Sequence, residues 1–155
     1  MNGLNIVLVG DLKNGRTVHS LVRLLTLYDV KLHYVSPPSL RMPAEIVEEL
    51  KNAGVSQTEY SDLERVLPFA DVLYVTRIQK ERFDSLNEYN AVAHSFVINA
   101  ESLSKLKTNM IIMHPLPRND EISKEVDLDP RACYFRQMRY GLFVRMALIY
   151  SVLKS

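Results

Sequence analysis

Three polar loops carry the side chains that are best suited to binding a small anion. Arg16 lies in the first loop, Arg77 and Gln79 lie in the second, and Arg118 lies in the third. An arginine presents a planar set of N–H donors that matches a carboxylate or a phosphate in a bidentate geometry. Two arginines that converge from different loops suit a small molecule with two negative charges. Any one of them taken alone is better explained as a surface or structural residue, so the prediction depends on the loops meeting.

The first loop has a second feature that favours anion binding. Its residues 10–15 match neither the dinucleotide-binding glycine pattern nor the P-loop pattern. The loop nevertheless leads into a predicted helix at Arg16 and Thr17. Free backbone N–H groups point outward at a helix N-terminus, and such groups bind anions.

Metal and covalent chemistry find little support in the sequence. The histidines lack the spacing of metal ligands; they are His19, His33, His94 and His114. Of these, only His114, which ends an apolar run and precedes two nearby prolines, is expected near a site. Cys133 is flanked by apolar and aromatic residues, so we expect a buried, unreactive thiol. We therefore predict chemistry by positioning and electrostatics, with no covalent catalytic residue, no metal and no cofactor.

Apolar runs alternate with amphipathic segments along most of the chain. The runs predict strands at 4–9, 31–35, 71–75, 94–98 and 110–113. The amphipathic segments predict helices near 18–28, 43–54, 61–68 and 101–107, the third of them beginning with a capping-box pattern at 61–64. This alternation predicts an α/β fold: a doubly wound, mostly parallel, Rossmann-like sheet of about five strands with helices on both faces.

The predicted sheet explains how the three loops would meet. Residues 10–17 follow the first predicted strand, residues 76–79 follow the third, and residues 114–118 follow the last. Ligands bind beyond the carboxyl ends of the strands in sheets of this kind. The sequence therefore predicts one site at that edge.

The last part of the chain differs from the rest. Residues 142–153 are apolar nearly all round a helix, with Arg145 and Ser151 as the polar interruptions. A helix of this kind is normally buried on more than one side. We expect residues 1–140 to form the ligand-binding domain and residues 141–155 to form a helix that packs on another surface.

Length, composition and charge limit the possible classes of protein. The chain has 155 residues, 47% of them hydrophobic, and a formal net charge of +1, which favours one globular domain and disfavours a nucleic-acid-binding protein. The single cysteine excludes an internal disulfide framework and fits a reducing compartment. Neither a signal peptide nor a bilayer-spanning segment is recognisable, so we expect a cytoplasmic protein that contacts no membrane.

The three loops together resemble the signature of the aspartate carbamoyltransferase family. The resemblance lies in residues 9–20, 74–82 and 114–118, which occur in the family's order and spacing, with Glu121 just after. It extends from about Leu4 to Leu153 and corresponds to the C-terminal, aspartate-binding half of the catalytic chain. Residues 36–43 and 134–137 are similar to the version within multifunctional pyrimidine-synthesis proteins.

The resemblance implies an activity and a set of partners. The family transfers the carbamoyl group of carbamoyl phosphate to the amine of L-aspartate in pyrimidine biosynthesis, and full-length chains form homotrimers. The half that carries the carbamoyl phosphate loop is not in this sequence. The resemblance therefore implies that the isolated chain is inactive and that its partner is the complementary carbamoyl phosphate domain.

The resemblance also implies roles for the residues in the first two loops. Arg16 would bind the α-carboxylate of aspartate, with Thr17 nearby. Arg77 would bind the side-chain carboxylate and would be oriented by Gln79.

The third loop and a set of charged residues would complete the site. The resemblance implies that the backbone carbonyls of Pro115 and Leu116, next to Pro117, accept hydrogen bonds from the carbamoyl NH2 group. It also implies a cis peptide between Leu116 and Pro117. The charged residues implied to form supporting ion-pair networks are Lys13, Glu81, Arg82, Arg118 and Glu121.

Two alternatives remain open at the level of sequence. An ornithine-type carbamoyltransferase usually has a Cys-Leu-Pro segment where this chain has His-Pro-Leu-Pro at 114–117. It also needs acidic contacts for a cationic side chain, whereas Arg77 suits an anionic one. A non-catalytic scaffold or regulatory module with the same fold would have no need for Arg16, Arg77, Gln79 and the proline loop. The aspartate-binding half of a carbamoyltransferase is the leading hypothesis.

Overall fold

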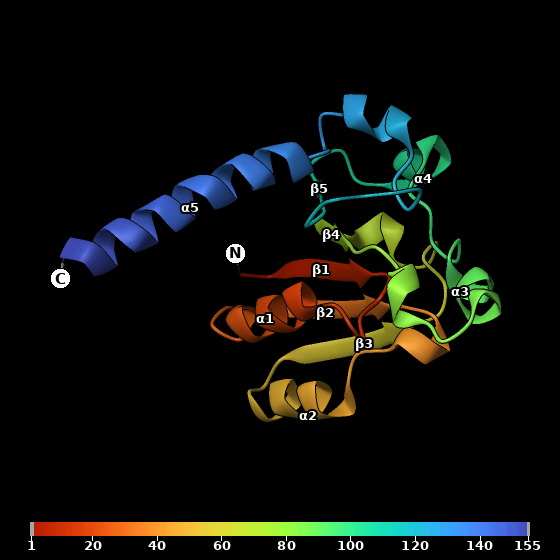
Figure 1. Cartoon of the computed structure of the whole chain (residues 1–155), viewed down its shortest axis with the longest axis horizontal. Coiled ribbons are helices and arrows are strands. Elements are labelled where there is room, and N and C mark those ends of the chain that lie inside the picture. The colour runs from red at the N-terminus through yellow and green to blue at the C-terminus, as the bar shows by residue number, and fades with distance from the viewer. Residues whose placement is uncertain (1, 155) are drawn as a thin grey trace.

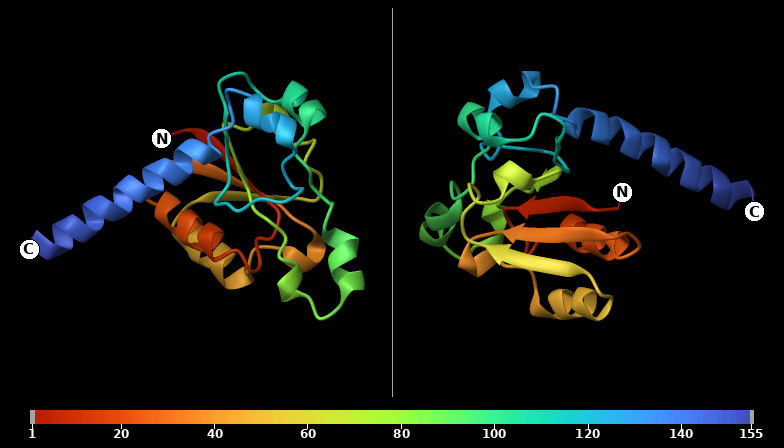
Figure 2. Two further views of the ribbon diagram at one scale, coloured as in Figure 1. Left: turned by 45° about the horizontal axis from the view of Figure 1, so that its top comes forward. Right: turned by 180° about the vertical axis from the view of Figure 1, so that it is seen from behind.

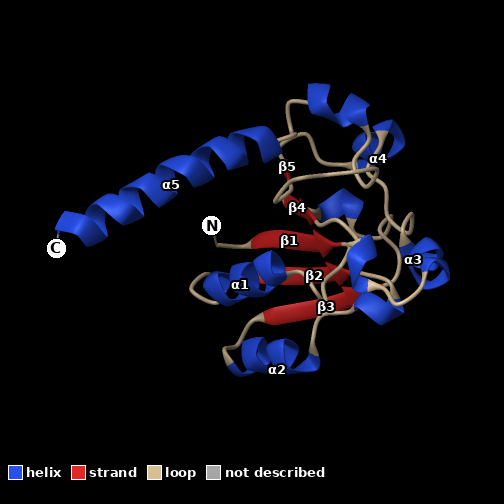
Figure 3. Cartoon of the chain, in the orientation of Figure 1, coloured by secondary structure: helices blue, strands red, loops and turns tan. Residues whose placement is uncertain are grey.

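Five parallel strands form the centre of the computed structural model, which describes residues 2–154 (Figures 1 and 3). The strands are β1 (Leu4–Val9), β2 (Val30–Val35), β3 (Ser56–Tyr60), β4 (Val72–Val75) and β5 (Ile111–Met113). They are arranged in the order β3-β2-β1-β4-β5. The connections therefore reverse direction at β1, between its neighbours β2 and β4, which is where doubly wound sheets bind ligands.

Residue pairing brings the carboxyl ends of neighbouring strands to one edge. Val9, the last residue of β1, is paired with Val35 of β2 and with Val75 of β4. Tyr74 of β4 is paired with Met113 at the end of β5. The loops after β1, β4 and β5 consequently start side by side, as the sequence predicts.

Helices cover both faces of the sheet (Figure 2). The helices of the chain are α1 (Arg16–Leu25), α2 (Ala44–Asn52), α3 (Leu86–Val92), α4 (Ala100–Lys105) and α5 (Tyr134–Lys154), of which α1, α2 and α4 pack on the sheet. On one face, Leu8 and Leu32 pack with Val22 of α1 and Leu50 of α2. On the other face, the alternate strand residues pack with α4 and with the segments on either side of it. Both faces are covered at residues 6–9 of β1, which are apolar and buried without interruption.

The structure corrects the prediction for residues 56–68. Residues 56–60 form the edge strand β3, which the sequence analysis missed because Ser, Gln, Thr and Glu make up most of it. The helix predicted at 61–68 does not form. Asp62 accepts the Glu64 N–H in a local turn, and only a short 3-10 helix at Leu67–Phe69 follows. Pro68 lacks an N–H and cannot join an α-helical hydrogen-bond ladder, which explains the shorter element.

The prediction of a strand at 94–98 is also wrong. Only Ile98 makes a bridge, and its partner is Ile122 rather than a strand of the sheet. The outer edge of β5 is instead occupied by residues 131–133, where the N–H of Ile112 donates to Arg131 and the N–H of Cys133 donates to Ile112. That edge has no room for another strand.

The last helix is longer than predicted and leaves the body of the molecule (Figures 1 and 2). It begins at Tyr134, which is buried against the sheet, and extends through Lys154. Beyond its first turn the helix is almost entirely exposed, including Leu148, which is 61% exposed. The large apolar side chains of α5 beyond Tyr134 are therefore between 49% and 81% exposed.

Candidate functional site

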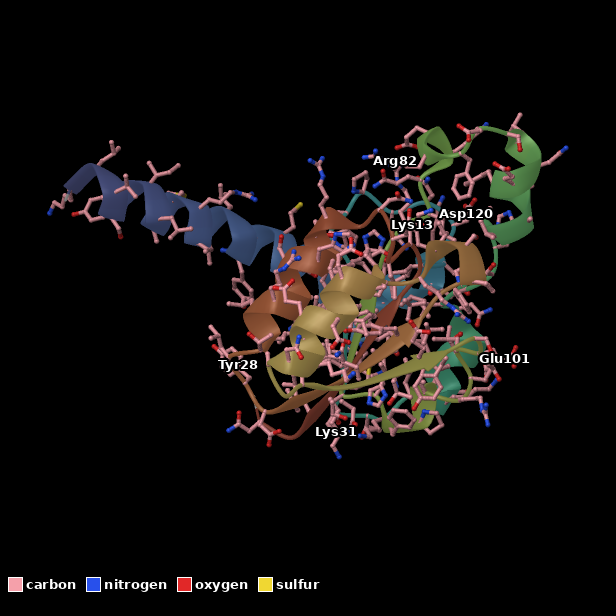
Figure 4. The ribbon with its side chains drawn as sticks, turned by 90° about the horizontal axis from the view of Figure 1, so that it is seen from below. Lys13, Tyr28, Lys31, Arg82, Glu101 and Asp120 are labelled. Carbon is pink, nitrogen blue, oxygen red and sulfur yellow. The ribbon has the colours of Figure 1, made fainter. Side chains whose placement is uncertain are left out.

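The three loops predicted to meet do meet, around one cavity of about 260 Å³. It lies beyond the carboxyl ends of β1, β4 and β5. The lining residues named by the sequence prediction are Arg16, Thr17, Arg77, Gln79, Arg82, Pro115, Leu116 and Pro117. The cavity is also lined by Asp11, Asn14, Gly15, Thr76 and His114. Figure 4 shows Lys13, Arg82 and Asp120 at this end of the molecule, away from Tyr28 and Lys31.

The first loop is shaped by a buried carboxylate and a glycine. Asp11 is almost fully buried, and its carboxylate accepts the backbone N–H of Asn14 at 2.8 Å. Gly10 has φ of +112°, and a Cβ there would lie 2.3 Å from the carbonyl oxygen of Thr76. Only glycine allows the end of β1 to approach the end of β4 this closely. The loop then enters α1, whose first turn places Arg16 and Thr17 on the cavity wall.

The second loop holds its side chains through local pairs. The Arg77 Nη2 lies 2.8 Å from Glu81 Oε1, and the Arg82 Nε donates to Gln79 Oε1 at 3.2 Å. The hydrogen bond from its own backbone N–H, together with the charges of Arg77 and Arg82, lowers the pKa of Glu81. Glu81 is therefore ionised at neutral pH and holds the Arg77 guanidinium by charge.

The third loop follows β5 and contributes backbone as well as side chains. The Leu116–Pro117 peptide is cis, as expected from the sequence, and Leu116 has φ of +52°. His114 is 1% exposed and lies beside Glu121, with Nε2 2.9 Å from Oε1. The backbone N–H of Asn119 donates to both oxygens of Glu121 at 3.1 Å.

The remaining predicted network residues lie beside the cavity rather than in it. Arg118 donates to Asp127 at 2.5 Å and to the carbonyl of Ile122 at 2.8 Å. Arg118 and Glu121 line a neighbouring cavity of about 430 Å³. Lys13 lines a third cavity, also of about 430 Å³, together with Arg82. Because Arg118 and Glu121 already have protein partners, they are better placed to support the loops than to bind a ligand.

Sequence reasoning missed the contribution of Asp11 and Thr76 to the cavity. The Thr76 hydroxyl donates to the carbonyl of Val9 at 3.0 Å and so ties β4 to β1. An Asp three residues before Asn14, directly after a strand, is typical of a turn closed by a side chain, and this signal could have identified Asp11. Cys133 is half-buried rather than fully buried, with Sγ 2.8 Å from Arg136 Nη2.

The cavity wall is predominantly basic. Three arginines line it, and Asp11 is the one carboxylate among its described lining residues. Within residues 2–154, no group of three or more His, Cys, Asp or Glu side chains is arranged to hold a metal ion. No helix in the same range is long and apolar enough to cross a membrane. This arrangement can bind a small dianion through charge-assisted hydrogen bonds.

Comparison with known proteins identifies the family of this arrangement. Residues 2–152 match the family model described as "Aspartate/ornithine carbamoyltransferase, Asp/Orn binding domain". The chain is 62% identical over 149 residues to the multifunctional protein pyr1-3 of Dictyostelium discoideum, a match that covers 96% of the chain and 7% of that protein.

Solved structures give the same result. The catalytic subunit of aspartate transcarbamoylase from M. Jannaschii superposes with a TM-score of 0.90 at 48% identity, covering 99% of this chain and 50% of that chain. Aspartate transcarbamoylase from Trypanosoma cruzi, in complex with carbamoyl phosphate and aspartate, superposes with a TM-score of 0.86 at 46% identity. The match covers 97% of this chain and 50% of that chain. The chain thus spans about half the length of these catalytic chains.

Proposed function

This chain belongs to the aspartate/ornithine carbamoyltransferase family, and we propose that it supplies the aspartate-binding half of an aspartate carbamoyltransferase active site. In that reaction the amine nitrogen of L-aspartate attacks the carbonyl carbon of carbamoyl phosphate. A C–N bond forms, the C–O bond to phosphate breaks, inorganic phosphate leaves and the amine loses a proton. The observation that carries the proposal is that Arg16 and Arg77, from two different loops, line one cavity.

The charge of the cavity favours aspartate over ornithine as the amine substrate. Aspartate carries two carboxylates, and each suits a guanidinium in a bidentate geometry. The ammonium group of an ornithine side chain would need an acidic partner. The carboxylate of Asp11 is buried and already accepts hydrogen bonds from the backbone and side chain of Asn14.

We assign the aspartate contacts to four side chains. Arg16, at the start of α1, binds the α-carboxylate, and Thr17 lies beside it on the same cavity wall. Arg77 binds the side-chain carboxylate, with Gln79 orienting it. Glu81 pairs with the Arg77 guanidinium at 2.8 Å, and the Arg77 side chain stays 28% exposed on the cavity wall, where a substrate can reach it.

The backbone of the third loop is assigned to the carbamoyl group. The carbonyl oxygens of Pro115 and Leu116 accept the two N–H bonds of the carbamoyl NH2 group, and Pro117 fixes the end of the loop. The supporting residues Lys13, Glu81, Arg82, Arg118 and Glu121 hold the loops in position around both substrates.

The other half of the active site would come from a carbamoyl phosphate-binding domain. We propose that α5 packs on that domain, because its exposed apolar residues need a partner surface. We further propose that the completed chain forms a homotrimer and acts in cytoplasmic pyrimidine synthesis. The 155-residue chain alone should then form no carbamoyl aspartate, and activity should require the complementary domain.

Titration of the chain with succinate or L-aspartate, followed by NMR, tests the proposal. The dicarboxylates should shift the amides of the first two loops, whereas L-ornithine should not. Arg77→Ala and Arg16→Ala should each weaken succinate binding by about 1.5–3 kcal/mol, since each removes a charge-assisted hydrogen bond. Arg23→Ala is the matched control, because Arg23 lies on α1 and pairs with Glu49 outside the cavity. Equal effects of Arg77→Ala and Arg23→Ala would refute the assignment.

A further inference from the structure

A buried histidine connects the third loop to the core below it. His114 follows β5 directly and is 1% exposed. Its backbone N–H donates to the side chain of Gln137 at 3.0 Å. Both ring nitrogens are engaged: Nε2 lies 2.9 Å from Glu121 Oε1, and Nδ1 lies 2.8 Å from the backbone nitrogen of Leu116.

These two partners determine which ring nitrogen carries the proton. The backbone N–H of Leu116 can only donate, so Nδ1 must accept and must carry no hydrogen. Nε2 is then the protonated nitrogen and donates to Glu121.

Glu121 is suited to accept the hydrogen bond from Nε2 of His114. Burial by itself raises the pKa of Glu121, but the hydrogen bonds from His114, from its own N–H and from the N–H of Asn119 outweigh it and lower the pKa. Glu121 is therefore an ionised acceptor at neutral pH. The neutral imidazole is held in one tautomer by a carboxylate on one side and a backbone amide on the other.

The amide that His114 holds belongs to a strained residue. Leu116 has φ of +52°, a left-handed conformation that side chains other than glycine adopt at a cost. Leu116 and its neighbours Pro115 and Pro117 line the cavity. Such a conformation persists only when the surrounding structure holds it in place. The hydrogen bond to Nδ1 is the contact from this structure that acts directly on the Leu116 amide.

We propose that His114 is a positioning residue, which holds Leu116 in its left-handed conformation through Nδ1 and thereby aims the backbone carbonyls of the third loop at the carbamoyl group. The assignment of those carbonyls rests on the proposed function. The tautomer and the Leu116 hydrogen bond do not, so they can be tested separately.

Two substitutions of His114 separate its two hydrogen bonds. His114→Asn keeps an acceptor near the position of Nδ1 and loses the donor to Glu121. His114→Gln keeps a donor near the position of Nε2 and loses the acceptor for Leu116. A purely structural role in filling space would be disturbed by both, whereas the proposed role is kept by His114→Asn alone.

Hydrogen exchange of the Leu116 amide gives the first readout. Exchange should be roughly tenfold faster in His114→Gln than in His114→Asn, which corresponds to the loss of about one hydrogen bond. In the wild-type chain, nitrogen-15 NMR of the His114 ring should show a protonated Nε2 and an unprotonated Nδ1. A protonated Nδ1, or equal exchange rates in the two variants, would overturn the proposal. If a variant fails to fold, the wild-type measurement can still overturn the proposal.

Activity of the enzyme completed by its carbamoyl phosphate-binding half gives the second readout. We expect kcat to fall about tenfold or more in His114→Gln and to be restored in His114→Asn, with little change in the KM for aspartate, because misplaced catalytic groups affect the chemical step most. Equal losses of kcat in both variants would overturn the positioning role. A wild-type enzyme without activity would instead refute the proposed function and leave the NMR result intact.

Discussion

Strand β1 and helix α5 are both rich in large apolar residues, yet their surroundings are opposite. Val7, Leu8 and Val9 of β1 are fully buried, with neighbours on both faces of the sheet. Leu148 and Leu153 of α5 are 61% and 81% exposed. The apolar residues of β1 are explained by contacts within this chain, whereas most of those of α5 are exposed to solvent.

The difference shows where folding and function depend on one another. The site loops grow from β1, β4 and β5, so the rigidity of the sheet is transmitted directly to the cavity. Helix α5 contributes no residue to the cavity lining, and its printed hydrogen bond to a lining residue comes from the start of the helix, where Gln137 accepts the backbone N–H of His114. We therefore expect damage to the sheet to affect both stability and the site, and damage to α5 to affect association.

The largest effect should come from removing a core side chain of the sheet. Leu73 of β4 is fully buried, so Leu73→Ala should lower the free energy of unfolding by about 2–5 kcal/mol through lost burial and a remaining cavity. Leu148→Ala is the matched substitution on α5. At concentrations where the chain is monomeric it should change the free energy by less than about 0.5 kcal/mol. Urea unfolding curves measure both, and equal costs would remove the distinction between the two regions.

The next effect concerns the association of the chain with itself. In solution without another partner, two copies should pair through α5, because each leaves a large apolar surface in water. Burying one large apolar side chain contributes roughly 1.5–3 kcal/mol. Deleting residues 141–155 should therefore convert a larger species to a monomer in light scattering.

A point substitution controls for that deletion. Leu148→Lys should weaken the association and leave the unfolding of the sheet unchanged. Leu27→Lys replaces another exposed leucine that lies outside α5 and should leave both the association and the unfolding unchanged. An oligomer that survives the deletion of 141–155 would show that another surface is responsible.

A smaller effect should appear as a pH dependence of stability. His33 is buried between Tyr60 and Phe69, and its Nδ1 has no hydrogen-bond partner within residues 2–154. Burial, with a contribution from the charge of Lys31, lowers the pKa of His33 below its ordinary value of about 6.5. The unfolded chain therefore binds this proton first as the pH falls. The contribution of His33 to the free energy of unfolding should be fully present above about pH 6.5 and should decrease below it.

His33→Gln tests this assignment, since glutamine keeps a donor to Asn5 and does not titrate. The decrease in the free energy of unfolding between pH 7 and about pH 5.5 should be smaller in the variant than in the wild type. Identical pH dependence would mean that another group is responsible. The carboxylates with lowered pKa values, such as Asp71, lose their contribution only at lower pH.

Much of the fold and the cavity could be predicted because local patterns coincide with tertiary contacts. The apolar runs of β1, β2, β4 and β5 mark strands that are buried or nearly so, and the loops after three of them form the cavity. Strand β3 could not be predicted in this way, because an edge strand with an exposed face needs few apolar residues. The short helix α3 was missed for a related reason, since its seven residues bury no side chain completely.

The contacts of His114 lay beyond sequence reasoning for a different reason. Its hydrogen bonds to Leu116 and Glu121 depend on how the third loop folds back, and no residue spacing specifies that path. The same holds for Glu81, whose ion pair with Arg77 follows from the turn at Lys80–Arg82. Proximity of these residue types could be predicted from sequence, whereas the individual partners required coordinates.

The smallest effects should come from replacing glycine by alanine once in α5 and once in the body of the molecule. Gly141 lies within α5, where an added Cβ would meet nothing closer than Arg145 at 3.9 Å. Gly141→Ala should stabilise the helix by about 0.5–1 kcal/mol, because alanine restricts the unfolded chain and favours the helical conformation. Gly54 follows Ala53, the residue that caps α2, with φ of +80°, and also has open space around it. Gly54→Ala should destabilise the body by roughly 1–2 kcal/mol, since the left-handed conformation is strained for alanine.

Helicity by circular dichroism measures the effect of Gly141→Ala, and urea unfolding measures the effect of Gly54→Ala. Two effects of the same sign would contradict the view that backbone conformation, rather than packing, decides the outcome at these two positions.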